Sequence, residues 1–173
     1  LEDLEGNGIE LYRDKPVTEW DIRGDGRIIG VTEELSAQAI YELGKELDPF
    51  IIASGTRMGH VHLSVKNSRE ASSFYQESLG LEDKFTIPHA SWIASGDYHH
   101  HLAVNEWGGK NLAPREHRMT GLAYYVVEVE NKEFLVNLFR KAQDQQEQLQ
   151  WISSSEFSII DKDGIVTRVR VGN

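Results

Sequence analysis

Five histidines in two short clusters are the residues best suited to chemistry. His60 and His62 flank a single valine, and His99, His100 and His101 follow one another directly. Alternate side chains of a β-strand share a face, so His60 and His62 would point to the same side. Neutral imidazole binds zinc, iron, manganese or nickel, and it exchanges protons near neutral pH. The clusters therefore predict a metal site or an acid–base site.

The second cluster lies in a strand-like run, Tyr98–Trp107. In a strand, His99 and His101 would face one way and His100 the other. The competing interpretation makes these histidines hydrogen-bonded polar residues of a surface strand or turn. For the first cluster, the competing interpretation is exposed positions on a half-buried strand.

Glu10 is the carboxylate that could join these histidines. It lies between Ile9 and Leu11 in a short segment whose pattern predicts a strand, and it faces opposite to these apolar neighbours. Two histidines and one carboxylate leave open positions on Fe(II) for substrate and dioxygen. Taken alone, a glutamate in this position is more often a solvent-facing strand residue.

Composition limits the classes of partner. The formal net charge is −10, which argues against nucleic acid and against anionic membrane surfaces, because both attract basic proteins. The chain has no cysteine, which excludes disulfides and thiolate metal sites and fits a reducing compartment. No apolar run approaches the ~18–20 residues that a membrane span needs. We therefore expect a cytoplasmic protein without a membrane-spanning segment.

The elements that must position these side chains form a repeated pattern. The first copy is a strand at 60–65, a helix that Ser68 could cap and Gly80 ends, and three strands at 84–87, 91–95 and 98–107. The second copy is a strand at 122–129, a helix at 132–146, and strands at 151–153, 157–160 and 165–171. An internal repeat of this kind predicts two similar modules that share a core.

Short matches set the register of the repeat. Val65-Lys66-Asn67 matches Val129-Glu130-Asn131 at an offset of 64 residues, which places Tyr124 opposite His60. The turn Asp3-x-x-Gly6 matches Asp161-x-x-Gly164, which places Arg168 opposite Glu10. The opening residues therefore look like the last strand of a preceding module.

These matches divide the chain into four parts. We expect residues 1–13 to be the last strand of a preceding βαβββ module, 14–56 to be a linker, and 57–112 and 113–173 to be two βαβββ modules. Within the linker we expect a strand at 27–31 and a helix that Ser36 caps, running to about Leu47 before Pro49 ends it. An open module invites pairing, so we expect a homo-oligomer or association with an N-terminal segment.

Several of these motifs resemble one known superfamily. Met58-Gly59-His60-Val61-His62-Leu63, followed by Phe74-Tyr75 and Leu79-Gly80-Leu81, is similar to the start of a vicinal-oxygen-chelate module. This superfamily contains glyoxalase I, bleomycin-resistance proteins and type I extradiol dioxygenases. More narrowly, several segments resemble the bacterial catechol-2,3-dioxygenase branch. They are Ala94–His101, Asn105-x-Trp107, Gly121-Leu122-x-Tyr124-Tyr125, and Gly6–Tyr12 with Asp14, Pro16 and Trp20.

The resemblance implies a fold and a chemistry. The fold is α+β, with paired βαβββ modules that form curved mixed sheets, and the chain would be the C-terminal part of a four-module protein. The activity is ring cleavage of a catechol-like aromatic by O2, on Fe(II) or Mn(II) held by two histidines and one glutamate.

The resemblance also implies roles for particular residues. His60 and Glu10 match metal-ligand positions, and His100 matches the acid–base histidine, with His101 or His99 as alternatives. The side chains that would line the substrate pocket are His62, Asn105, Trp107 and Tyr124. The last module holds Tyr124 and Arg168 where the family has ligands, so a third ligand would have to come from outside this chain.

Two other functions fit the same motifs. One is a glyoxalase-type isomerisation, or transfer of a thiol to a small electrophile, on the same modules, because fold does not fix function. The other is a metal-free protein of the bleomycin-resistance type that binds a small aromatic molecule. Tyr124 and Arg168 favour that last interpretation, since neither side chain can replace the metal ligand that the family has at its position.

Overall fold

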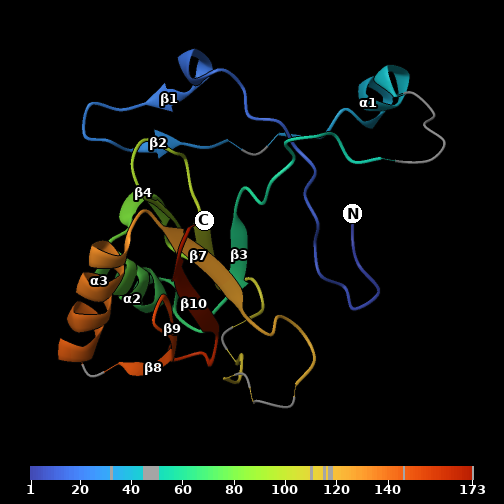
Figure 1. Cartoon of the computed structure of the whole chain (residues 1–173). Coiled ribbons are helices and arrows are strands. Elements are labelled where there is room, and N and C mark those ends of the chain that lie inside the picture. The colour runs from blue at the N-terminus through green and yellow to red at the C-terminus, as the bar shows by residue number, and fades with distance from the viewer. Residues whose placement is uncertain are drawn as a thin grey trace.

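Two units with the same order of elements make up the folded body of the chain. The computed structural model in Figure 1 describes residues 1–31, 33–44, 51–109, 111–114, 116, 119–145 and 147–172. The first unit consists of β3 (Val61–Ser64), α2 (Ser68–Leu79), β4 (Glu82–Ile87), β5 (Ala90–Ala94) and β6 (Leu102–Asn105). The second consists of β7 (Tyr125–Val129), α3 (Lys132–Asp144), β8 (Gln148–Ser153), β9 (Glu156–Ile160) and β10 (Val166–Val171).

Each unit forms a four-stranded mixed sheet of the same topology. The strand order is β3-β6-β5-β4 in the first sheet and β7-β10-β9-β8 in the second. In both, the first and last strands pair in parallel and the other neighbours pair antiparallel. Helices α2 and α3 begin 64 residues apart, at Ser68 and Lys132. The predicted repeat and its α+β fold are therefore confirmed.

The ends of α2 show how local sequence sets its bounds. Asn67, rather than the expected Ser68, is the N-cap, and its side-chain oxygen accepts hydrogen bonds from the backbone N–H groups of Arg69 and Glu70. The Ser68 hydroxyl instead donates to Glu106. Gly80 closes the helix in the left-handed region, with a φ of 70°, as predicted. Of the two helix ends, only the start needed correction, by one residue.

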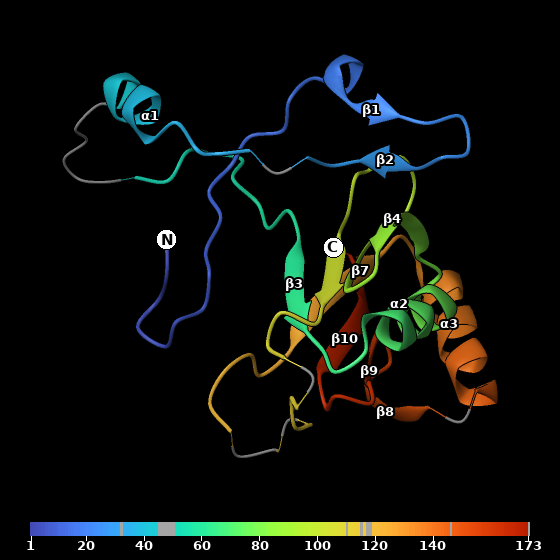
Figure 2. The ribbon, with the colours of Figure 1, turned by 180° about the vertical axis from the view of Figure 1, so that it is seen from behind.

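One hydrophobic core joins the two units. It takes Leu63 and Val65 from the first unit and Leu135 and Phe157 from the second, each at most 3% exposed. Helices α2 and α3 lie side by side on one flank, as both views show (Figure 2). Because Leu63 faces this core, the alternate residues of β3 face the other side of the sheet. That opposite side carries His62.

The N-terminal third is built from short elements. These are a 3-10 turn at Val17–Glu19, the hairpin of β1 (Asp21–Ile22) and β2 (Ile28–Ile29), and helix α1 (Ala37–Leu43). The hairpin lies against β4, where Ile28 is buried (Figure 1). The strand expected at 27–31 is thus only two residues long. Helix α1 ends at Leu43, and Gly44 is its C-cap. The expected end near Leu47 and Pro49 lies outside the described residues, as does Gln146, the expected last residue of the second predicted helix.

Ile9–Tyr12, where a strand was expected, pairs with no strand in the described part of the chain. The nearby backbone forms a bridge between Glu2 and Gly8, and the Ile9 backbone pairs with that of Leu1. The strand was expected to pair within a preceding module, so it stays a prediction. Whether residues 1–13 belong to a preceding module stays a prediction. Among the described residues, no helix combines the length and the apolarity needed to span a membrane.

Candidate metal centre

Histidines from the two sequence clusters meet at one point. Ring nitrogens of His60, His62 and His100 all lie within 4.8 Å of one another. The ring centroids are 4.3 Å apart for His60 and His100, and 5.0 Å apart for His60 and His62. His60 immediately precedes β3 and His62 lies within it, so the predicted shared face is confirmed. The parallel pairing of β3 with β6 brings the second cluster beside the first.

The backbone around His100 differs from the expected strand. β6 begins only at Leu102, where the chain pairs with both β3 and β5, and residues 98–101 form a bend before it. In a bend the side chains do not alternate, and the three histidines point to three different partners. His100 joins the cluster, His99 contacts Asp14, and His101 Nδ1 accepts a hydrogen bond from the Ser95 backbone N–H at 3.2 Å. His101 thus lies outside the group.

The N-terminal segment reaches the cluster, although it is not a strand. Glu10 Oε2 lies 2.9 Å from His60 Nε2, and the Tyr12 hydroxyl lies 3.0 Å from His60 Nδ1. Gly59 makes the second contact possible, because a Cβ at this position would lie 1.9 Å from the Tyr12 hydroxyl oxygen. Both nitrogens of His60 are therefore held by residues of one short segment.

A chain of polar contacts surrounds these histidines. Asp14 accepts hydrogen bonds from the Tyr98 hydroxyl and from His99 Nε2, each at 2.9 Å. His99 Nδ1 lies 2.7 Å from His100 Nδ1, and the Tyr12 and Tyr98 hydroxyls are 3.1 Å apart. Sequence reasoning assigned no role to Tyr12, Asp14 or Tyr98. Their only sequence signal is that all three lie within the motifs that resemble the dioxygenase branch.

Burial disfavours the charged form of two imidazoles of the cluster, His100 and His62. It lowers the pKa of His100 to about 2, and the neighbouring His60 adds to the effect. It lowers the pKa of His62 as well, again with His60 as the second cause. For Asp14, burial alone would raise the pKa, but the hydrogen bonds from His99 and Tyr98 outweigh it and the pKa is lowered. The neutral forms of His62 and His100 are thus favoured, and so is the ionised form of Asp14.

This donor set fits a divalent transition metal. His100 Nε2 is buried and has no hydrogen-bond partner among the described residues, which is costly for a nitrogen unless a ligand uses it. Two ligands at about 2.1 Å from one ion and at right angles to each other lie about 3 Å apart, which matches the 2.9 Å between His60 Nε2 and Glu10 Oε2. The third donor, expected from outside the chain, is available here from His100 or His62.

The remaining predicted pocket residues are not all at the cluster. The Trp107 ring is 66% exposed, and its centroid lies 6.2 Å from that of His62. Asn105 is buried, and its side-chain oxygen accepts the Trp107 backbone N–H. Tyr124, at the repeat position of His60, lies under the guanidinium of Arg168, 3.8 Å from its ring centroid. Of these residues, Trp107 is the one whose ring contacts a cluster histidine.

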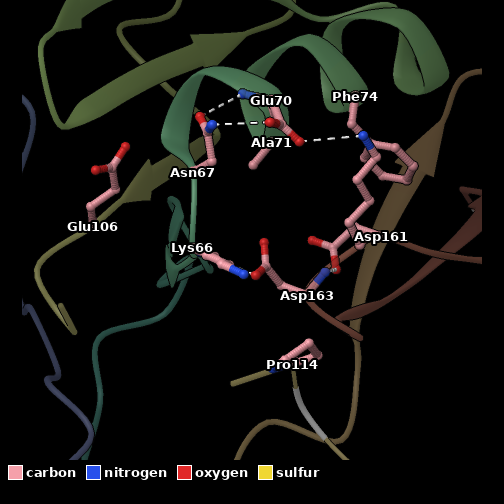
Figure 3. Close-up of a pocket in the computed structure, with 10 residues that line it drawn as sticks. Lys66, Asn67, Glu70, Ala71, Phe74, Glu106, Pro114, Asp161 and Asp163 are labelled. Carbon is pink, nitrogen blue, oxygen red and sulfur yellow. Dashed lines mark hydrogen bonds and ion pairs between the residues drawn. The ribbon is translucent and has the colours of Figure 1, made fainter. Parts of the chain in front are cut away.

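A separate cavity of about 520 Å³ lies where α2 meets the loop before β10 (Figure 3). Its polar lining is largely paired within the protein: the Lys66 backbone N–H donates to Asp163, and Lys162 pairs with Glu70. The buried Asp161 accepts the Tyr75 hydroxyl at 2.7 Å. These contacts explain the cavity as part of the junction between the two units.

Comparison with known proteins agrees with this geometry. Residues 57–167 match the family described as the Glyoxalase/Bleomycin resistance protein/Dioxygenase superfamily. A catechol-2,3-dioxygenase of Bacillus subtilis (strain 168) is 32% identical over 137 residues, which cover 78% of this chain and 48% of that protein. The chain thus spans about half the length of this relative.

Solved structures show the same fold at low identity. A lactoylglutathione lyase from Agrobacterium tumefaciens superposes with a TM-score of 0.52 at 14% identity, covering 69% of this chain and 96% of the other. A glyoxylase/bleomycin resistance protein/dioxygenase domain from Frankia sp. EAN1pec gives 0.54 at 17% identity, covering 69% and 100%. The repeated βαβββ units, the histidine cluster and these matches lead to one conclusion: the chain belongs to the glyoxalase/bleomycin resistance protein/dioxygenase superfamily.

Proposed function

We propose that this chain carries the metal centre of an extradiol dioxygenase, which opens a catechol ring beside its two hydroxyl groups. The observation that carries the proposal is the meeting of His60, His62 and His100 with Glu10 beside His60. The 32% identity to a catechol-2,3-dioxygenase supports this choice within the superfamily. The structural neighbours support only the fold.

We assign His60, His100 and Glu10 as the metal ligands. The His100 ring is neutral at physiological pH, and its buried Nε2 has no other partner in the described chain. These properties suit a ligand better than the acid–base role expected from the family resemblance, because an imidazole with so low a pKa is a poor proton acceptor. Two imidazoles and a carboxylate are the donors used by non-haem Fe(II) oxygenases.

His62 takes the acid–base role in this proposal. Its side chain is exposed on the face of β3 that carries the cluster, and Trp107 lies beside it. An aromatic substrate that rests on the Trp107 ring would bring a hydroxyl within reach of the His62 imidazole. Bound Fe(II) or Mn(II) would act as a Lewis acid that holds the diol oxygens and O2 next to each other.

Oxygen consumption with a catechol tests this assignment. We expect the Fe(II)-loaded protein to consume O2 together with catechol. His62→Ala should keep its iron and lose turnover, whereas His100→Ala should lose iron. A protein that keeps full iron content and full oxygen uptake after His100→Ala would contradict the ligand assignment. Iron-loaded protein that consumes no O2 with any simple catechol would contradict the dioxygenase proposal.

A further inference from the structure

Asp14 lies where two hydrogen-bond chains begin, and each chain ends on a histidine of the metal centre. One chain runs from Asp14 through His99 to His100. The other runs from Asp14 through Tyr98 and Tyr12 to His60. A carboxylate only accepts hydrogen bonds, so both chains have a fixed direction at their origin.

The direction of the first chain places a proton on His100. His99 Nε2 must donate to Asp14 Oδ1, and in neutral His99 the other ring nitrogen, Nδ1, is then an acceptor. His100 Nδ1 lies 2.7 Å from that acceptor and must therefore carry the hydrogen. The neutral His100 ring is left with an unprotonated Nε2. This is the buried nitrogen that has no partner in the described part of the chain.

The second chain does not fix the tautomer of His60. Tyr98 spends its only hydrogen on Asp14 Oδ2, so Tyr12 would donate to the Tyr98 oxygen and accept a hydrogen from His60 Nδ1. Glu10 Oε2 also only accepts, and its distance of 2.9 Å from His60 Nε2 calls for a hydrogen on that nitrogen instead. Asp14 therefore directs the hydrogen of His100 but not that of His60.

We propose that Asp14 is a positioning residue that, through His99, places a hydrogen on Nδ1 of His100 and so presents the His100 Nε2 lone pair to the metal ion. This inference rests on the proposed metal centre. It goes beyond that centre by naming a carboxylate that is not a ligand and that sets the tautomer of one. Partners of this kind orient metal-bound histidines and raise their basicity.

Asp14→Ala gives the sharpest test, because it removes the acceptor that holds a hydrogen on His99 Nε2. His99 Nδ1 is then free to carry the hydrogen, and His100 loses the acceptor that keeps its own hydrogen on Nδ1. Asp21→Ala is the matched control, since Asp21 pairs with Arg23 in the β1–β2 hairpin.

Imidazole ¹⁵N chemical shifts of the metal-free full chain, recorded at about pH 8.5 and thus well above the ordinary histidine pKa, report the tautomers directly. We expect Nδ1–H on His100 in the unmodified protein and in Asp21→Ala, and a shift of the hydrogen toward Nε2 in Asp14→Ala. Tyr98→Phe breaks only the second chain, so it should leave His100 unchanged. A bare Nδ1 on His100 of the unmodified protein, or an unchanged His100 ring in Asp14→Ala, would overturn the inference.

Metal affinity gives the second readout. Competition of Zn(II) with a chelator should show binding about 10- to 100-fold weaker in Asp14→Ala than in Asp21→Ala. Equal affinity in the two variants, despite a changed tautomer, would overturn the proposed link between Asp14 and the metal. Predicted tautomers in a protein that binds no metal would support the hydrogen-bond assignment and contradict the proposed function instead.

Discussion

His60 Nε2 lies 2.9 Å from Glu10 Oε2, although fifty residues separate the two side chains in the sequence. The contact joins the N-terminal segment to the edge of the first sheet, at the point where His100 also arrives. The His60 side chain is 9% exposed, and that of Glu10 is 67% exposed. A carboxylate in this place supplies charge to the centre while staying in contact with solvent.

Removing the charge of Glu10 is expected to weaken metal binding. Glu10→Gln keeps the shape of the side chain but replaces an anionic oxygen donor with a neutral one. We expect Mn(II) affinity to fall by at least about 10-fold, the lower end of what loss of a partner around a metal costs. Titration of the metal-free protein measures this. Glu5→Gln, an exposed glutamate of the same segment, is the control, and equal affinities in the two variants would show that Glu10 is no ligand.

Gly59→Ala should detach the N-terminal segment from the cluster. The new Cβ would lie 1.9 Å from the Tyr12 hydroxyl oxygen, so Tyr12 must move away from His60. Gly24→Ala is the control, because no atom lies within 4 Å of a Cβ there. We expect faster amide hydrogen exchange over residues 9–14 in Gly59→Ala than in Gly24→Ala. Unchanged exchange in this segment would mean that Tyr12 does not hold it in place.

The shared face of His60 and His62 is the part of the site that the sequence predicts well. Strand alternation put His60 and His62 on one face, and the repeat predicted the 64-residue spacing between the starts of α2 and α3. Both inferences use periods that backbone geometry imposes, so they need no knowledge of distant contacts. The same reasoning failed at His99–His101, because a strand-like composition does not show at which residue pairing begins. Pairing begins at Leu102.

Contacts made across the fold could not be predicted from local pattern. Asp14 is hydrogen-bonded to Tyr98 and His99, which lie more than eighty residues away in the sequence. No feature of the residues next to Asp14 indicates these contacts. Ile9–Tyr12 alternates as a strand does, yet it pairs with no strand of the described residues. Whether an alternating segment pairs depends on the rest of the fold, which the segment does not encode.

The low pKa of the half-buried His100 predicts how stability depends on pH. Its folded-state pKa of about 2 lies below the ordinary value of 6.5, so between these values the folded protein binds fewer protons than the unfolded chain. The free energy of unfolding of the metal-free protein should therefore fall as pH is lowered below about 6.5. His100→Gln should make this fall shallower, as urea unfolding between about pH 7.5 and pH 5 would show. His89→Gln, at an exposed histidine, should retain the steep fall; equal slopes in both variants would contradict the account.

The shared core predicts that damage in the second unit destabilises the first. Leu135 on α3 is fully buried in the core that both units form. Leu135→Ala should lower the free energy of unfolding by about 2–5 kcal/mol, within one cooperative transition. Asn137→Ala, on the exposed face of the same helix, should change it by less than about 0.5 kcal/mol. Separate transitions for the two units would show that the core does not couple them.

Calorimetric titration of Mn(II) into the metal-free full chain tests the metal centre most directly. The account predicts saturable binding to the unmodified protein and to His89→Ala, whose histidine lies on the exposed surface away from the cluster. It predicts no saturable binding to His60→Ala, since His60 contacts Glu10 and lies against both His62 and His100. Absence of binding to the unmodified protein, or equal binding to His60→Ala, would contradict it.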